Sequence, residues 1–178
     1  MPEIDTRRRR PSRFNRLVAF LALVAAAHFA GVAPTLAEAI KAPGSRIAIA
    51  VPAGFEVSKL FSGFLHPNAR ASIVIAELPT DRFDEIMAGM TDEALAGKGI
   101  KDITRGKLER GDDHHFMTGT QNARGMDVDK FILLIKDEKG VGVVTANVPK
   151  SAITDGDLTR EAVLAALASA TLTDETAP

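Results

Sequence analysis

Two acidic residues followed by two histidines form the densest group of potential metal ligands in the sequence: Asp112, Asp113, His114 and His115. Carboxylates and imidazoles are ligands that suit zinc and other transition metals. Neighbouring strand residues point to opposite faces, however, so His114 and His115 cannot readily bind one ion. His66 would join them only through a tertiary contact. We therefore favour a turn followed by two ordinary histidines over a metal site, and we expect no cofactor.

A second group of polar side chains is predicted at a hairpin tip. A register that pairs Thr118 with Asp129 and Thr120 with Asp127 places all four on one face. Such a cluster is a candidate for binding a cation, a small polar ligand or a partner. The favoured interpretation is the solvated end of a sheet.

The segment from Asp155 to Glu161 alternates oxygen ligands as calcium loops do. It lacks the glycine at the sixth position and the distant bidentate glutamate of an EF-hand. A helix cap at Asp157 or Thr159, with Glu161 in the first turn, explains the residues more simply.

A basic stretch lies on a predicted edge strand and comprises Lys98, Lys101, Arg105, Lys107 and Arg110. Alternation predicts Lys101, Arg105 and Lys107 on one side, where positive charge discourages pairing with other sheets. An acidic partner or an anionic lipid is the alternative use of this charge.

The sequence carries no local signature of catalysis. It has no cysteine, no Gly-x-Ser-x-Gly or Ser-x-x-Lys motif, and no glycine-rich phosphate loop between a strand and a helix. We expect a non-enzymatic protein. A hydrolase assembled from residues far apart in the sequence is the least favoured reading.

The elements that must position these residues can be predicted from periodicity. Alternating and branched residues predict strands at 46–51, 55–65, 71–78, 101–109, 114–121, 126–136 and 141–148, with the first three as a meander. Apolar residues at helical spacing predict helices from 80 to 90, from 91 to 96 and from 159 to 169, capped by Thr80 or Asp81, by Thr91, and by Asp157 or Thr159. The methionines and phenylalanine of the first helix fit core packing better than a ligand groove.

The central strands predict a sheet that is covered on both faces. One face carries Phe116, Phe131, Leu133, Ile135 and Val144, and the other carries Met117, Val128, Ile132, Leu134, Val141 and Val143. Because both sets are apolar, helices must cover each face. The fold class is therefore α+β, a three-layer α/β/α sandwich around a mainly antiparallel sheet of about six to seven strands.

The first 39 residues are typical of a secretory signal peptide. Six arginines precede the apolar run 17–33, and Ala37-Glu38-Ala39 offers a small-x-small cleavage site. We expect cleavage after Ala39, a periplasmic domain at 40–178 and a frayed tail at 171–178. An uncleaved anchor in the inner membrane is the alternative, in which case a membrane span would remain.

Removing the leader changes the charge of the protein. It holds six of the 22 basic and three of the 23 acidic residues, which leaves 16 against 20. A mature domain of net charge about −4 is not expected to bind nucleic acid.

The order of elements resembles a known fold family. The residues that carry the resemblance are Val51-Pro52-Ala53-Gly54-Phe55 after the first strand, Glu77-Leu78-Pro79 before the first helix and Asn147-Val148-Pro149 before the last. They resemble the PsbP-like (Mog-type) α/β/α sandwiches. That resemblance implies an exported accessory or binding protein. It brings no catalytic motif, and the lack of cysteine excludes a lipoprotein.

Two binding functions follow as expectations. The favoured one is recognition of a protein partner or envelope component through a sheet edge or a pocket beneath a helix. The alternative is a carrier of a small molecule or lipid, with Phe55, Phe61 and Phe64 lining an apolar cavity.

Overall fold

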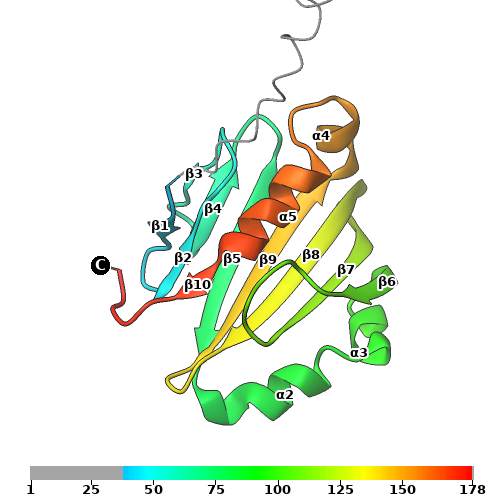
Figure 1. Cartoon of the computed structure of the whole chain (residues 1–178). Helices are drawn as coiled ribbons and strands as arrows, with labels where there is room; N and C mark the ends of the chain where they lie inside the picture. Colours follow the sequence, from blue (N-terminus) through cyan, green and yellow to red (C-terminus); the bar gives the residue numbers. More distant parts are fainter. Residues whose placement is uncertain (1–37, 178) are drawn as a thin grey trace, which may run out of the picture. The chain divides into compact units, whose positions relative to one another are not determined.

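The computed structural model describes residues 38–177, which form two antiparallel sheets and four α-helices (Figure 1). Most of the predicted leader, including Ala37 of the cleavage site, lies outside these residues. The strands are β1 (Ile40–Lys41), β2 (Ile47–Ile49), β3 (Glu56–Val57), β4 (Gly63–His66), β5 (Ala71–Leu78), β6 (Ile100–Gly106), β7 (His114–Ala123), β8 (Met126–Lys136), β9 (Val141–Pro149) and β10 (Thr171–Leu172). The helices are η2 (Thr80–Arg82, 3₁₀), α2 (Phe83–Ala88), α3 (Asp92–Gly97), α4 (Lys150–Thr154) and α5 (Arg160–Ser169).

The larger sheet has seven strands in the order β3-β4-β5-β9-β8-β7-β6. Its long central strands β7, β8 and β9 lie close to the predicted boundaries, and short turns separate them. Arg124 (φ 53°) and Gly125 (φ 81°) form the turn between β7 and β8, and two positive φ values suit a tight hairpin. The predicted fold class, an α+β sandwich around a mainly antiparallel sheet, is confirmed.

The register of the β7–β8 hairpin differs from the predicted one by two residues. Thr118 faces Phe131, and Thr120 faces Asp129. The tight turn at 124–125 lets β7 continue two residues beyond its predicted end, to Ala123, while β8 begins at Met126 as predicted. A shift of two residues keeps every side chain on its predicted face, since the side-chain period of a strand is two. The predicted pairing of Leu133 with Val144 is confirmed.

The two apolar faces of the sheet are confirmed. One, here called the α5 face, joins Phe131, Leu133 and Val144 to a core that includes Val163 and Leu167 of α5. Figure 1 shows α5 lying across this sheet. The other, here called the α3 face, carries a second core of Leu95, Ile100, Met117, Ile132 and Leu134, packed by Ile86, Met87 and Met90. Residues 131–135 of β8 are all buried because both faces are covered there.

The first predicted strand is not part of the meander. Instead, β2 lies between β1 and β10 in a separate three-stranded sheet. The segment expected as one strand at 55–65 forms the short strands β3 and β4, separated by a loop in which Ser58 N donates to Gly63 O. The meander is therefore β3-β4-β5.

The tail after α5 is ordered, in contrast to the expected fraying. Thr171 pairs with Ala48 and Leu172 with Ile47, so β10 completes the small sheet. Thr173 N also donates to Arg46 O at 2.9 Å.

The helix caps agree with the sequence at two of three positions. The hydroxyls of Thr91 and Thr159 accept hydrogen bonds from the N–H groups three residues later, which caps α3 and α5 as predicted. Neither Thr80 nor Asp81 caps α2, because the chain first makes a 3₁₀ turn and the Thr80 hydroxyl donates to Glu138 O. The short helix α4 was not predicted.

Candidate functional site

The predicted group of acidic residues and histidines is divided between the two faces of the sheet. His114 pairs with Ile135 on the α5 face and His115 pairs with Leu134 on the α3 face, as the alternation predicted. Leu108 N donates to His114 Nε2 at 3.0 Å. Nδ1 must therefore carry the hydrogen and donate to Asp112 O, also 3.0 Å away. Both ring nitrogens of His114 are thus occupied by the backbone.

His66 lies elsewhere and has a structural role. Its Nδ1 accepts from Ala69 N at 3.1 Å, and its ring meets that of Phe55 edge-on at 5.3 Å. Within residues 38–177, no three or more His, Asp or Glu side chains are grouped so as to hold a metal ion.

The predicted polar group of Thr118, Thr120, Asp127 and Asp129 does share one face. Its members are nevertheless engaged differently from the prediction. The Thr120 hydroxyl donates to Asp102 Oδ2 at 2.7 Å, and Asp127 Oδ1 accepts from Asn122 Nδ2 at 3.0 Å. Thr120 and Asp127 therefore have local partners, and a ligand at this tip stays a prediction.

The segment that echoes a calcium loop caps two helices. Thr159 is the N-cap of α5, as predicted, and Asp155 is the C-cap of α4, which was not predicted. Its backbone is fixed by Leu158 N, which donates to Ala152 O at 3.0 Å.

Lys101 and Arg105 of the basic stretch lie on the edge strand β6, whereas Lys98 precedes it and Lys107 and Arg110 follow it, and the charges do not form one patch. A bulge between Lys101 and Thr104, with Asp102 at φ 52°, moves Lys101 and Arg105 to opposite faces. Arg105 pairs with Asp92, and Arg110 pairs with Asp112 and donates to the carbonyls of Leu167 and Ala168 at the end of α5.

The three phenylalanines expected around a carrier cavity occupy different environments. Phe64 is fully buried in the core beneath α5, and Phe55 packs against the same core. Phe61 is half-buried. Phe64 and the partly buried Phe55 are thus packed into the core, where they occupy space that a ligand would need.

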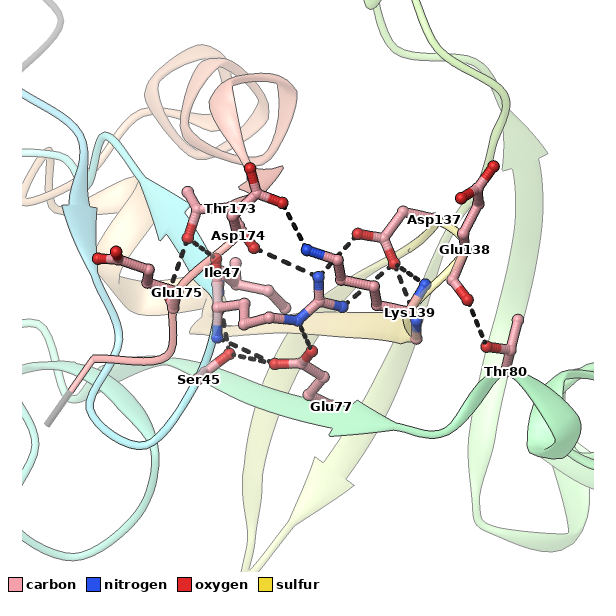
Figure 2. Close-up of polar contacts among 12 residues, drawn as sticks. Ser45, Ile47, Glu77, Thr80, Asp137, Glu138, Lys139, Thr173, Asp174 and Glu175 are labelled. Carbon is pink, nitrogen blue, oxygen red and sulfur yellow. Dashed lines mark hydrogen bonds and ion pairs between the residues drawn. The ribbon is translucent and has the colours of Figure 1, made fainter.

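The most highly connected charged group in the described residues surrounds Arg46, which is only 7% exposed. Arg46 Nε donates to Glu77 Oε1 at 2.5 Å, while Nη1 and Nη2 donate to the two Asp137 oxygens at 2.8 and 3.1 Å. Nη1 also reaches Thr173 O at 3.3 Å. Figure 2 shows Ser45, Glu77, Asp137 and Thr173 converging from four separate segments.

These contacts shift the pKa values of both partners. The hydrogen bond with Asp137, reinforced by Glu77, raises the pKa of Arg46 above its ordinary value despite its burial. The same hydrogen bond, with help from the N–H groups of Lys139 and Gly140, lowers the pKa of Asp137 to about 2. Because four of the five guanidinium N–H bonds are already directed at protein oxygens, this cluster is suited to joining the two sheets and not to binding a ligand.

A different part of the molecule is open. On the α3 face, α2 and α3 pack over β6, β7 and β8, whereas β4, β5 and β9 have half-exposed or exposed side chains. We call this area the open patch; it comprises Leu65, Ser72, Val74, Ala76, Thr145 and Asn147, bordered by Lys130. The two faces of the sheet differ clearly along β5. Ala71, Ile73 and Ile75 lie on the α5 face and are buried, whereas the residues between them lie on the α3 face and are not.

A row of polar side chains crosses the open patch. Lys130 pairs with Asn147 and Asn147 pairs with Ser72, so the three lie side by side on β8, β9 and β5. Lys130 Nζ donates to Asn147 Oδ1 at 2.6 Å, and Asn147 Nδ2 donates to Ser72 Oγ at 3.1 Å. Since an ammonium can only donate, this chain of bonds fixes the orientation of the amide.

The row presents donors to the surface. Burial lowers the pKa of Lys130. One of its three N–H bonds is directed at Asn147, and the Ser72 hydroxyl, which accepts from Asn147, donates to none of the described residues. The row can therefore donate to carbonyl or carboxylate oxygens of a partner.

Neither Arg46 nor the row was singled out in the sequence. Each depends on strands distant in the chain, and Lys130, Asn147 and Ser72 carry no motif. The one sequence feature that pointed to the row is the polar Ser72 within the apolar segment of β5, where it occupies a half-exposed position between buried residues.

Comparisons with known proteins give the fold but no family. No family model matches the chain, and no curated protein matches it. The PsbP-like resemblance therefore remains an expectation.

Solved structures align with this chain at low identity. A structure from Bacteroides thetaiotaomicron VPI-5482 aligns with a TM-score of 0.50 at 10% identity, over 79% of this chain and 50% of that one. This chain thus spans half the length of that protein, and the likeness concerns the fold alone. LpqN, described as involved in cell envelope biogenesis of Mycobacterium tuberculosis, aligns with a TM-score of 0.47 at 17% identity, over 71% of this chain and 83% of LpqN. No functional inference rests on either alignment.

Proposed function

We propose that this chain is an exported accessory protein that binds an envelope component or an envelope protein through the open patch. The observation that carries the proposal is the uncovered half of the α3 face, where a row of hydrogen-bond donors lies among small and apolar side chains. Flat sheet surfaces of this kind are suited to recognition, and apolar groups there supply contact area while Lys130 supplies orientation.

Export is supported by the leader pattern in the sequence, with its arginines, apolar run and small-x-small site. The absence of cysteine is compatible with an oxidising compartment. In residues 38–177 no helix is long and apolar enough to cross a membrane. The intact mass of the exported protein tests this part: a chain beginning at Ile40 supports cleavage after Ala39, and one beginning near Met1 contradicts it.

Site-specific photo-crosslinking in the producing cell tests the binding surface. A photoreactive residue at Thr145, in the centre of the open patch, should give a defined adduct. The same residue at Asp84, exposed on α2, is the matched position outside the patch. We expect Lys130→Met to reduce the Thr145 adduct. Lys136→Met removes an exposed lysine from the same strand and face, and should leave the adduct unchanged.

Equal adducts from Thr145 and Asp84, or equal effects of the two lysine substitutions, would contradict the assignment of the open patch. Native mass spectrometry separates the carrier alternative. A constant small-molecule adduct on the purified protein would favour a carrier over a docking protein.

A further inference from the structure

Three methionines line one recess between the end of α2 and strands β6 and β7. The recess has a volume of about 160 Å³, and Met87, Met90 and Met117 contribute to its lining together with His115. The whole chain has five methionines, and Met126 is the first residue of β8, at the opposite end of the β7–β8 hairpin. Most of the thioether sulfur after Met1 is therefore gathered in one place.

Two elements create this arrangement. Met87 and Met90 are three residues apart at the end of α2, where Met90 N donates to Met87 O at 3.0 Å, so both belong to the same turn. His115 and Met117 are two residues apart on β7 and therefore share the α3 face. The packing of α2 over β7 brings the two pairs together.

The side chains at the recess differ in burial. Leu95, Ile132 and Leu134 form the buried centre of this face, and Met117 is buried with them. Met87 and Met90 are only partly buried, and His115 is exposed. The His115 imidazole makes no hydrogen bond with any described residue, and its ring lies 5.9 Å from that of Phe83.

The donor set selects among metals. Thioethers are soft ligands that favour Cu(I), and imidazole also binds copper, whereas zinc and calcium prefer imidazole, thiolate or oxygen donors. The charge of the residues around the recess also favours Cu(I). Arg105 and Lys107 also line the recess, and only Asp113 is acidic there. Neutral ligands beside basic residues disfavour a divalent ion more than a monovalent one.

We propose that this recess is a Cu(I) site in which Met87, Met90, Met117 and His115 supply the ligands. Arg105 does not oppose this arrangement strongly, because its guanidinium is paired with Asp92 and donates to Met90 O at 2.6 Å. That contact also fixes the backbone at Met90. A site made only of thioethers and imidazole needs no thiol, so disulfide formation cannot inactivate it.

An anaerobic competition titration tests the proposal. The exported protein is mixed with Cu(I) held by a chromophoric chelator, and transfer of one equivalent to the protein is the expected result. Met90→Leu and Met117→Leu preserve volume and should weaken Cu(I) binding by at least about tenfold, as loss of supporting interactions at metal sites commonly does. Met126→Leu is the matched control and should bind like the unmodified protein. Retention of all Cu(I) by the chelator, or an equal loss in the Met126→Leu variant, would overturn the proposal.

A second measurement does not depend on the variants folding identically. In protein labelled at the methionine methyl carbons, Ag(I), a redox-inert probe for soft monovalent sites, should shift the resonances of Met87, Met90 and Met117 and leave Met126 unchanged. Uniform shifts, or binding of Zn(II) as tight as that of Cu(I), would contradict a soft-metal site.

Discussion

At the scale of single residues, Arg46 is the side chain on which most contacts depend. It bonds to Glu77 on β5, to Asp137 in the β8–β9 turn and to Thr173 after β10. Its removal would leave two carboxylates facing each other in a partly buried site, where like charges are costly. This residue therefore links the small sheet to the large one.

We predict that Arg46→Met lowers the free energy of unfolding by about 2–4 kcal/mol, somewhat less than for a fully buried pair because Glu77 and Asp137 retain some exposure. Urea denaturation measures the change. Arg82→Met is the matched control, since Arg82 forms an exposed pair with Glu85 three residues away and should cost less than about 0.5 kcal/mol. Similar losses in the two variants would refute the special role of Arg46.

Asp137 should make stability depend on pH in an acidic window. Its folded pKa of about 2 lies below the ordinary value of 3.8, so its contribution is present above about pH 4 and is lost as pH falls toward 2. We expect Asp137→Asn to reduce the slope of the unfolding free energy between these values. The same slope in both proteins would show that other carboxylates control acid unfolding.

At the scale of elements, short β4 depends on a close approach to β5. Gly63 has φ 136°, and a Cβ there would lie 2.0 Å from Ile73 O. The strand pairing of Gly63 with Val74 leaves no room for a side chain. Glycine is required here by both backbone conformation and contact distance.

Gly63→Ala should destabilise the protein by about 3 kcal/mol or more, because backbone atoms must move to accept the methyl group. Gly111→Ala is a suitable control, since a Cβ at Gly111 meets nothing within 4 Å. Thermal unfolding of the two variants provides the comparison. A tolerated Gly63→Ala would mean that β4 can separate from β5 at little cost.

At the scale of the whole domain, the C-terminal segment closes the small sheet. β10 pairs with β2, and residues beyond it bond to Ser45 and Arg46. The two ends of the described chain are therefore held together by the same sheet. This arrangement predicts that the segment contributes to global stability even though it is short.

Deletion of residues 171–178 should lower the Tm by roughly 5–10 °C, which corresponds to a loss of about 2 kcal/mol for a domain of this size. Deletion of Pro178 alone is the control and should have little effect. Calorimetry of both proteins distinguishes them. An unchanged Tm after the longer deletion would indicate that β10 adds no stability.

The sequence by itself determined the long elements and the two faces of the central sheet. Residues 126–136 and 141–149 alternate or run apolar between clear turn signals, and Thr91 and Thr159 have the hydroxyl that a helix N-terminus needs. These features depend on neighbours within a few residues. The register of Thr118 and Thr120 failed because the hairpin turn was placed too early, although the period of two preserved their face.

Only the tertiary structure decided where the short strands pair and which polar groups meet. β2 joins β10 across more than 120 residues, and Arg46 meets Glu77 and Asp137 from separate segments. Lys130, Asn147 and Ser72 form a row only because β9 lies between β8 and β5. The methionines of α2 pack against the core as predicted, and only the placement of α2 over β7 shows which strand they meet. Local periodicity sets the direction of a side chain, whereas its partner depends on strand order, which no local pattern contains.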